Sequence, residues 1–448
     1  MRLELTYDYL VRHIVPGPQS LSYFVTIVLL PVALLIPRSV LSRWQSIAFF
    51  IPIMVGCTIH AWTAMGTVDV PSLDVLLWAL FLLVFKDPWT EFALLEPSTQ
   101  PTIDSEKSLT GKEAANAPSK SVNSTTSKQK PYPPTLRART PWTLRLLSNL
   151  TLDNWLIAHP SHDKNQPRPP ASRSRASFLA HTLLHSALAY LTLDLTSALT
   201  TTDPYFTNPT IPLSSHGPVP RLLRPTLISL QAHALISSLF PLPSVLPVLL
   251  SALHLLPPAC SPHVWPPYFG PPAAFLRHGL RGWWGGYWHQ TMRWATSGAG
   301  IALADWAGLR EGGFARRALV LVSAFGLSGV VHLGLVPPEP VGGDGGAWRA
   351  RACVAGFFWV QVLGVLGEDV VGRMLGRVRV GVGMEEGRCG WVRGAVNVIW
   401  LCCWFAWCMP LLGEAGRLLG WWRHWLVPVS LYRGLRGEGW VTWDFLKE

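Results

Sequence analysis

Charged side chains are scarce in this chain. Asp, Glu, Lys and Arg make up 14% of its 448 residues, whereas an average soluble domain carries about 25%. Hydrophobic residues account for 49%, and the mean hydropathy is +0.27. A soluble fold needs more surface charge, and a disordered chain needs lower hydrophobicity. The composition therefore indicates a polytopic membrane protein.

Cysteine is also scarce. The seven cysteines are odd in number, and no two of them form a Cys-x-x-Cys pair. Disulfide-rich domains use even numbers of cysteines, and zinc sites use closely spaced pairs. The sequence therefore indicates neither a disulfide-stapled secreted domain nor a zinc centre.

Acidic residues are fewer than basic ones, 26 against 37, which gives a formal net charge of +11. An excess of this sign favours an anionic partner, either nucleic acid or a membrane surface. Because the chain also carries long apolar runs, we expect the lipid bilayer to be that partner and no nucleic acid to be bound.

Apolar stretches recur along the chain, several of them near the length that crosses a hydrocarbon core. They predict an all-α, polytopic integral membrane protein with about eight to ten transmembrane or re-entrant helices. The stretches are Ser22–Ile36, Ile47–Met65, Leu73–Phe85, Ala176–Leu199, Leu222–Phe240, Val245–Leu256, Ala295–Ala307, Ala318–Val336, Ala352–Val371 and Val392–Leu412.

Composition also divides the chain into successive segments. Transmembrane helices occupy 1–95. The Pro-, Ser- and Lys-rich segment 96–140 is expected to be a disordered loop, and its basic surroundings place it in the cytosol. An interfacial segment and the middle transmembrane helices follow in 141–260. The most motif-rich part is 261–413, and an amphipathic segment is expected in 414–448.

Ionisable side chains are expensive inside apolar spans, so each is a candidate functional residue. His332 lies near the end of one such span, and Ser328 lies four residues earlier on the same helix face. An apolar setting keeps a histidine neutral, as a general base requires. The alternative is a histidine that is hydrogen-bonded across a pair of helices.

A second candidate cluster lies in the aromatic stretch 266–294. It contains Trp288, His289, Gln290 and Arg293 close to a pair of glycines. An interfacial aromatic belt explains the Trp and Arg residues well. It explains the glycine pair and the adjacent His and Gln less well. From the residues alone, a belt and a site are equally good interpretations.

A third candidate cluster is the span 357–373. Gln361 and Glu368 are seven residues apart and share a helix face, while Asp369 and Arg373 are spaced for an ion pair. The pattern favours a structural interpretation, with a helix–helix hydrogen bond and an ion pair at the membrane edge.

Taken together, these motifs resemble the signature of the wax-synthase-like branch of the membrane-bound O-acyltransferases. The resemblance is dense over 265–373. It departs from the family pattern at Gly279, where the family has Ser, and at Trp283, where it has Phe. The similar stretches are Trp-Pro-Pro-x-Phe-Gly at 265–270, Leu-Arg-x-x-Trp-Gly at 280–285, Trp-His-Gln at 288–290, Phe-x-x-Ser-Gly-x-x-His at 325–332, and the span from Phe357 to Asp369.

The resemblance implies an acyl-CoA-dependent O-acyltransferase, of the EC 2.3.1 class, that joins an acyl group to an alcohol. It implies no metal and no cofactor beyond the acyl-CoA co-substrate. His332 would deprotonate the hydroxyl, and His289 would orient the acyl group or polarise its carbonyl. The candidate substrate-binding residues are Trp288, Gln290, Arg293, Ser328 and Glu368.

Members with the Trp-His-Gln form are similar to fungal acetyltransferases that act in terpenoid and related secondary-metabolite pathways. The expected donor is therefore acetyl-CoA, the expected acceptor is a hydrophobic alcohol such as a terpenoid, and the expected location is the endoplasmic reticulum membrane. A long-chain wax or sterol ester synthase is the alternative enzyme. A polytopic transporter is the alternative from another class, although the sequence lacks the internal repeat that marks many transporters.

Overall fold

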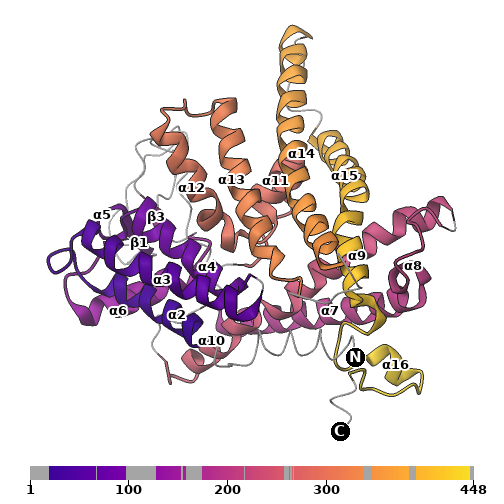
Figure 1. The fold of residues 1–448 in the computed structure, drawn as a ribbon, viewed down its shortest axis with the longest axis horizontal. Coiled ribbons are helices and arrows are strands. Elements are labelled where there is room, and N and C mark those ends of the chain that lie inside the picture. Colours follow the sequence, from indigo (N-terminus) through magenta and orange to yellow (C-terminus); the bar gives the residue numbers. More distant parts are fainter. Residues whose placement is uncertain are drawn as a thin grey trace, which may run out of the picture.

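Helices dominate the computed structural model, as Figure 1 shows. Six helical segments are long and apolar enough to cross a membrane: Arg43–Met65, Arg175–Thr202, Pro218–Ala252, Phe314–Leu333, Gly346–Met374 and Trp391–Leu419. This confirms an all-α, multi-pass integral membrane protein. The structure describes residues 20–66, 68–96, 128–152, 155–157, 174–215, 217–256, 262, 265, 267–337, 346–382 and 390–443.

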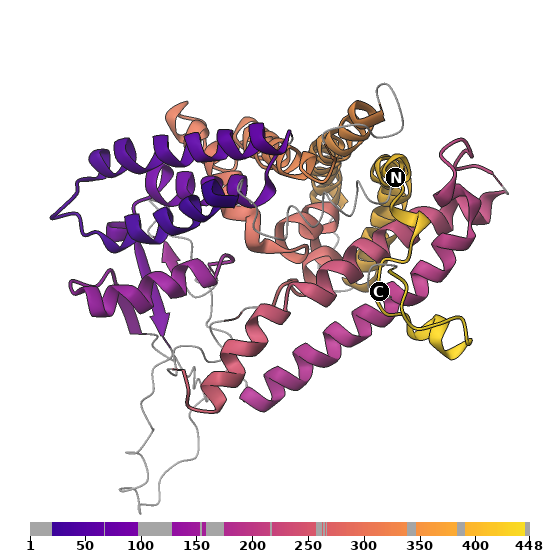
Figure 2. The ribbon, with the colours of Figure 1, turned by 60° about the horizontal axis from the view of Figure 1, so that its bottom comes forward.

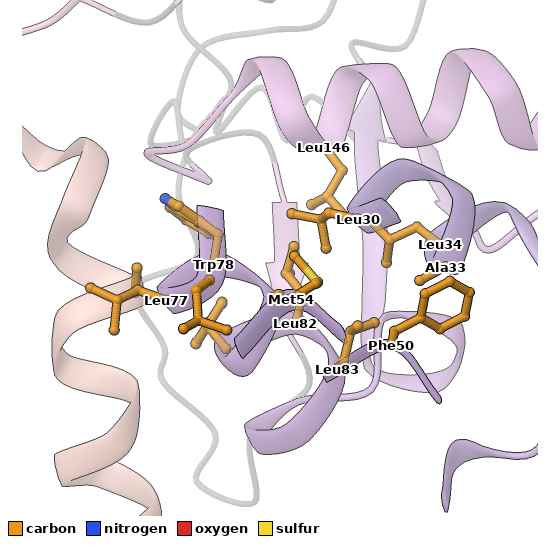
Figure 3. Close-up of a cluster of buried hydrophobic side chains, with 14 of the residues drawn as sticks. Leu30, Ala33, Leu34, Phe50, Met54, Leu77, Trp78, Leu82, Leu83 and Leu146 are labelled. Atoms are coloured by element: carbon orange, nitrogen blue, oxygen red, sulfur yellow. The ribbon is translucent and has the colours of Figure 1, made fainter. Parts of the chain in front are cut away.

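The first helices pack around a shared hydrophobic core, drawn in Figure 3. They are α2 (Ser20–Leu35), α3 (Arg43–Met65), α4 (Val70–Ala79) with a π-helical turn (Leu80–Phe85), α5 (Pro88–Glu91) and α6 (Leu136–Ser148). α3 begins at a capping box formed by Ser42 and Gln45 and ends at Gly66, whose φ of 67° suits glycine. Leu34 of α2, Phe50 of α3 and Leu146 of α6 meet in the core.

A small antiparallel sheet accompanies these helices. β1 (Phe92–Glu96) lies between β2 (Lys128–Pro131) and β3 (Trp155–Ile157). The expectation of disorder over the whole of 96–140 is therefore wrong for residues 128–140, which form β2 and the start of α6. The composition of this part is polar, but β2 pairs with β1 and the Tyr132 hydroxyl donates to the carbonyl of Leu34 at 2.9 Å. Residues 97–127, for which disorder was also expected, lie outside the described residues.

The middle of the chain forms a layer of helices beneath the others: α7 (Arg175–Thr202), α8 (Pro204–Thr207), α9 (Pro218–Leu239) and α10 (Val245–Ala252). Figure 2 shows α7 and α9, in magenta and rose, running alongside one another. An ion pair fixes the connection between them, because the buried Arg224 donates to the half-buried Asp203 at 2.7 Å. The Gln231 amide also donates to Thr200 at 3.0 Å.

The helices between residues 273 and 419 stand above this layer, whereas the short α16 (Leu431–Leu435) lies below it (Figure 1). Phe325 of α13 and Phe357 of α14 belong to a second hydrophobic core, which also takes in buried side chains of α15. The elements are α11 (Ala273–Gly282), α12 (Arg293–Trp306), α13 (Phe314–Leu333), α14 (Gly346–Val382), α15 (Gly390–Leu419) and α16 (Leu431–Leu435).

The segment 414–448 is not one amphipathic piece. Residues 414–419 complete α15, and the later described residues fold back onto α7. The Tyr432 backbone N–H donates to Asp194 at 3.0 Å, and the Tyr190 hydroxyl donates to the Val429 carbonyl at 2.7 Å. The polar groups of α7 therefore bind this returning segment.

Candidate active site

A sharp bend in α11 begins the candidate site. Gly279 adopts φ 57° and ψ −135°, a conformation that L side chains rarely adopt. Glu368 of α14 holds the bend, because its two carboxylate oxygens accept from the backbone N–H groups of Leu280 at 2.9 Å and Arg281 at 2.8 Å. A Cβ at position 279 would overlap that carboxylate. Glycine at position 279 therefore leaves the space that the Glu368 carboxylate occupies, and this carboxylate in turn stabilises the bend at Gly279.

A π-helical turn, Trp283–Tyr287, follows the bend. Turns of this kind occur often at functional sites. The Gly270 N–H donates to the Tyr287 carbonyl at 2.8 Å, and a Cβ at Gly270 would overlap the carbonyl oxygen of Gly286. We name the described residues of 265–290 the site loop. Backbone contacts join the start of this loop, at Gly270, to its end, at Gly286 and Tyr287.

Gln361 ties the site loop to two helices. Its Oε1 accepts from the indole N–H of Trp284 at 3.1 Å and from that of Trp404 on α15 at 2.9 Å. Its Nε2 donates to the Phe357 carbonyl at 3.0 Å. The helix–helix hydrogen bond expected for Gln361 is confirmed. This amide is fully buried, and such a group must find partners for both of its ends.

The structure fixes which nitrogen of His332 carries its proton. Nδ1 lies 2.7 Å from the backbone carbonyl of Ser328, one turn earlier on α13. A carbonyl only accepts, so Nδ1 must donate, and in the neutral ring Nε2 is left as the acceptor. Phe358 packs against the imidazole with ring centroids 4.4 Å apart. Ser328 shares the helix face of His332, as expected, and its contact to the ring runs through the backbone oxygen.

His289 lies in the site loop between aromatic rings. Tyr268 stacks on it at 5.7 Å between centroids, and the Trp288 ring is 5.5 Å away. Burial, followed by the nearby His332, lowers the pKa of His289 to about 4. The two imidazoles are therefore close enough to interact electrostatically, and His289 is neutral at physiological pH. Its Nδ1 is buried and has no hydrogen-bond partner among the described residues.

Gln290 presents a second unpartnered polar atom. Its Nε2 donates to the carbonyl of Trp284 at 3.2 Å and to that of Trp288. Because a carbonyl can only accept, the NH2 end of the Gln290 amide must face these two carbonyls. Its oxygen, Oε1, then faces the other way and is buried without a partner. Buried polar atoms without partners are rare in folded proteins. Two of them on adjacent residues, His289 and Gln290, indicate a place for a ligand.

The structure brings only some of the expected site residues together. Trp288 packs against Trp283 at 5.7 Å within the site loop. Arg293 lies at the start of α12, where its guanidinium is 5.6 Å from the Trp294 ring. Glu368 is engaged with the backbone of α11, as described above.

The expected ion pair between Asp369 and Arg373 is wrong. Asp369 instead faces Arg281 of α11 at 3.6 Å and Arg317 of α13 at 3.4 Å. Arg373 donates to the backbone carbonyl of Asp369 at 3.3 Å. The spacing of four residues does bring Arg373 to the same helix face as Asp369, but the guanidinium groups of Arg281 and Arg317, from other helices, pair with the carboxylate instead.

Basic residues gather on the outer side of α11, a cluster named the basic face below. Arg277 and Arg281 belong to α11, and Arg393 belongs to α15. Burial and then these three arginines lower the pKa of His278, which lies among them. Arg277 and Arg281 are exposed. This face therefore offers positive charge to a soluble anion.

One further imidazole near the site, that of His233, was not among the residues predicted from the sequence. It reaches the site loop from α9, where its Nε2 lies 3.0 Å from the Tyr287 hydroxyl. The signal available in the sequence was the general one that ionisable residues in apolar helices are functional candidates. Nothing in the sequence connected position 233 with position 287.

Comparisons with known proteins agree with this geometry. Residues 265–339, which include the site loop and His332, match the model of the membrane bound O-acyl transferase family. The chain is 29% identical over 245 residues to acetyltransferase ataH of Aspergillus terreus, covering 51% of this chain and 75% of that protein. It is 29% identical over 191 residues to acetyltransferase aurG of Calcarisporium arbuscula, covering 42% of each. No solved structure matches the chain significantly.

The matched segment and the two relatives support an acyltransferase enzyme, and the six apolar helices support its location in a membrane. The resemblance to the membrane-bound O-acyltransferases is confirmed by the family match and by the two relatives named as acetyltransferases.

Proposed function

We propose that the protein transfers an acetyl group from acetyl-CoA to a hydroxyl of a hydrophobic small molecule, such as a terpenoid secondary metabolite, in the endoplasmic reticulum membrane. The observation that carries the proposal is the hydrogen bonding of two imidazoles. His332 has its Nδ1 fixed on a backbone carbonyl and its Nε2 left as a base. His289 of the site loop is neutral and has a buried Nδ1 with no described partner.

In the proposed reaction, Nε2 of His332 accepts the proton of the acceptor hydroxyl as its oxygen attacks the thioester carbonyl. Nδ1 of His289 donates a hydrogen bond to the oxyanion that develops on that carbonyl. The carbon–sulfur bond then breaks. His332 returns its proton to the departing thiolate, so the products are the ester and CoA, and no proton is gained or lost.

The neighbouring residues have supporting roles in this proposal. Oε1 of Gln290 accepts from an N–H of the pantetheine arm, and Trp288 forms a wall of the acyl site. Ser328 holds the base through its carbonyl. Arg293 remains a proposed donor contact at the start of α12. Glu368 acts at a distance by setting the bend that aims the site loop.

The basic face supports CoA as the donor. Arg281 of the basic face shares the Asp369 carboxylate with Arg317 of α13. Arg317 and His332 lie on that one helix, 15 residues apart, which corresponds to about 22 Å along the helix axis. An extended pantetheine arm spans a distance of this order. The nucleotide phosphates would then lie against arginines at one end while the thioester reaches His332 at the other. A site enclosed by helices also keeps water from the thioester.

The names of the relatives support a short acyl chain, because both are acetyltransferases. A long-chain wax or sterol ester synthase would use the same base and the same donor phosphates. The donor competition below separates these two enzymes, and flux without covalent turnover would indicate the transporter.

The proposed function is tested in microsomes supplied with labelled acetyl-CoA, labelled palmitoyl-CoA and a panel of hydrophobic alcohols that includes terpenoids. We expect labelled acetyl ester in the organic phase and a clear preference for the acetyl donor. A preference for palmitoyl-CoA would instead establish the long-chain synthase. Accumulation of unmodified alcohol inside the vesicles, with no ester from either donor, would contradict acyl transfer.

The role of the basic face is tested by the double variant Arg277→Ala with Arg393→Ala. An exposed ion pair contributes up to about 1 kcal/mol, so we expect the KM for acetyl-CoA to rise roughly 3- to 10-fold. The KM for S-acetylpantetheine, which lacks the nucleotide, should stay unchanged. The matched control is Arg349→Ala. Arg349 is an exposed arginine at the start of α14 that pairs with Glu414 of α15. Equal effects on the two donors would show that these arginines do not bind the phosphates.

A further inference from the structure

His233 of α9 makes two contacts with residues of the site loop and one with its own helix. Its ring stacks on Phe269 with centroids 4.4 Å apart and an interplanar angle of 22°. Its Nε2 lies 3.0 Å from the Tyr287 hydroxyl, and its Nδ1 lies 3.3 Å from the hydroxyl of Ser237 on α9 itself. Both ring nitrogens are thus engaged, and the imidazole is fixed in its orientation.

Tyr287 is the residue through which His233 reaches the site. Its backbone carbonyl accepts from Gly270 at 2.8 Å, and its ring packs on Phe275 at 4.9 Å and on Trp283 at 4.9 Å. Its hydroxyl is held by His233. Both ends of this tyrosine are therefore anchored, and the anchor at the ring end comes from a different helix.

Tyr287 lies two residues before His289 in the site loop. Only Trp288 separates the two residues, and the Trp288 ring is itself 6.2 Å from the His233 ring. The Nδ1 of His289, which has no partner among the described residues, is the group proposed to meet the acyl carbonyl. A shift of about 1 Å in a catalytic group can lower a rate by as much as 100-fold. A contact that sets Tyr287 therefore sets the geometry of the reaction.

We propose that His233 is a positioning residue for acyl transfer, acting through its hydrogen bond to Tyr287 to hold His289 toward the acyl carbonyl. The inference rests on the proposed function. It adds a residue that lies outside the matched segment 265–339 and couples the α7–α9 layer to the site loop. The interaction is directional, so a ring of similar size that lacks the hydrogen bond should not replace it.

The test is a double-mutant cycle on ester formation with His233→Phe, Tyr287→Phe and both together. Each single variant keeps an aromatic ring in place and removes the same hydrogen bond. We expect each to lower kcat by roughly 10- to 100-fold, with the KM for acetyl-CoA within about 2-fold of wild type. The double variant should be no slower than the slower single one, because the two changes remove one interaction.

His233→Gln is the conservative variant. Its side-chain amide retains a polar group able to reach the Tyr287 hydroxyl, so we expect it to recover most of the activity lost in His233→Phe. His181→Phe is the matched control, since His181 is an exposed histidine of α7 whose ring stacks on His185. It should leave kcat unchanged. Activity of His233→Phe equal to wild type, or multiplicative losses in the double variant, would overturn the proposal.

A second measurement separates this inference from the proposed function. Diethyl pyrocarbonate modifies unprotonated imidazoles, and peptide mass spectrometry reads the rate at His289 without any turnover. We expect His233→Phe and Tyr287→Phe to change this rate severalfold, while the rate at His181 in the same molecules stays constant. A changed rate in a protein that makes no ester would retain the positioning role and reject acyl transfer. An unchanged rate would reject the positioning role.

Discussion

His332→Ala is expected to lower kcat for ester formation by on the order of 10²- to 10⁴-fold, the range that a general base contributes. The physical reason is the single lone pair at Nε2. The contact of Nδ1 with the Ser328 carbonyl fixes that tautomer.

His332→Asn makes the test of the base sharper. Its amide can donate to the Ser328 carbonyl much as Nδ1 does, but it offers no basic nitrogen. We therefore expect it to be as inactive as His332→Ala while it remains as abundant in the membrane as wild type. The measurements are kcat in microsomes and the amount of folded protein by size-exclusion chromatography in detergent. A fully active His332→Asn variant would remove the histidine from its proposed role.

Gly279→Ala is expected to have the second large effect, and it acts through structure. The φ of 57° disfavours any side chain by about 1–2 kcal/mol. The new Cβ would also displace the Glu368 carboxylate, whose charge-assisted hydrogen bonds to backbone N–H groups contribute roughly 1.5–3 kcal/mol. We expect a lower unfolding temperature in detergent and loss of most ester formation.

Gly367→Ala is the matched control for this variant. Gly367 lies next to Glu368 on α14 in an exposed position, and a Cβ there would meet no atom within 4 Å. Alanine is favoured over glycine within a helix by roughly 0.5–1 kcal/mol. The control should therefore be unchanged or slightly stabilised. A Gly279→Ala protein as stable and active as the control would show that the bend in α11 tolerates a side chain.

Much of the fold follows from hydropathy, because apolar runs of sufficient length have few alternatives to membrane helices. The same reasoning predicted too much disorder. Residues 128–140 are polar and basic, yet they form β2 and the start of α6, because their partners are β1 and the end of α2. Pairing with residues far away in the sequence is not visible in local composition.

In the candidate site, too, local patterns were predictable from the sequence and contacts between distant residues were not. Its local motifs identified His332, His289 and Gln290, and the structure shows buried polar atoms without described partners on His289 and Gln290. The sequence also indicated Glu368 as a substrate contact, but its partners are two backbone N–H groups that only the bend at Gly279 presents. The contribution of His233 depends on its contact with Tyr287, which is 54 residues away in the sequence. The spacing of residues within a helix cannot predict such a contact.

The register of the small sheet has a practical consequence for building reporters. Its β1–β2 ladder closes with Glu96 directly opposite Lys128, so these two residues lie at neighbouring positions. An inserted domain whose own ends lie close together, such as a fluorescent protein, would fit between these two residues without stretching the flanking strands. A short hairpin turn would join the same two strand ends. The sheet thus provides a defined attachment point for a visible reporter.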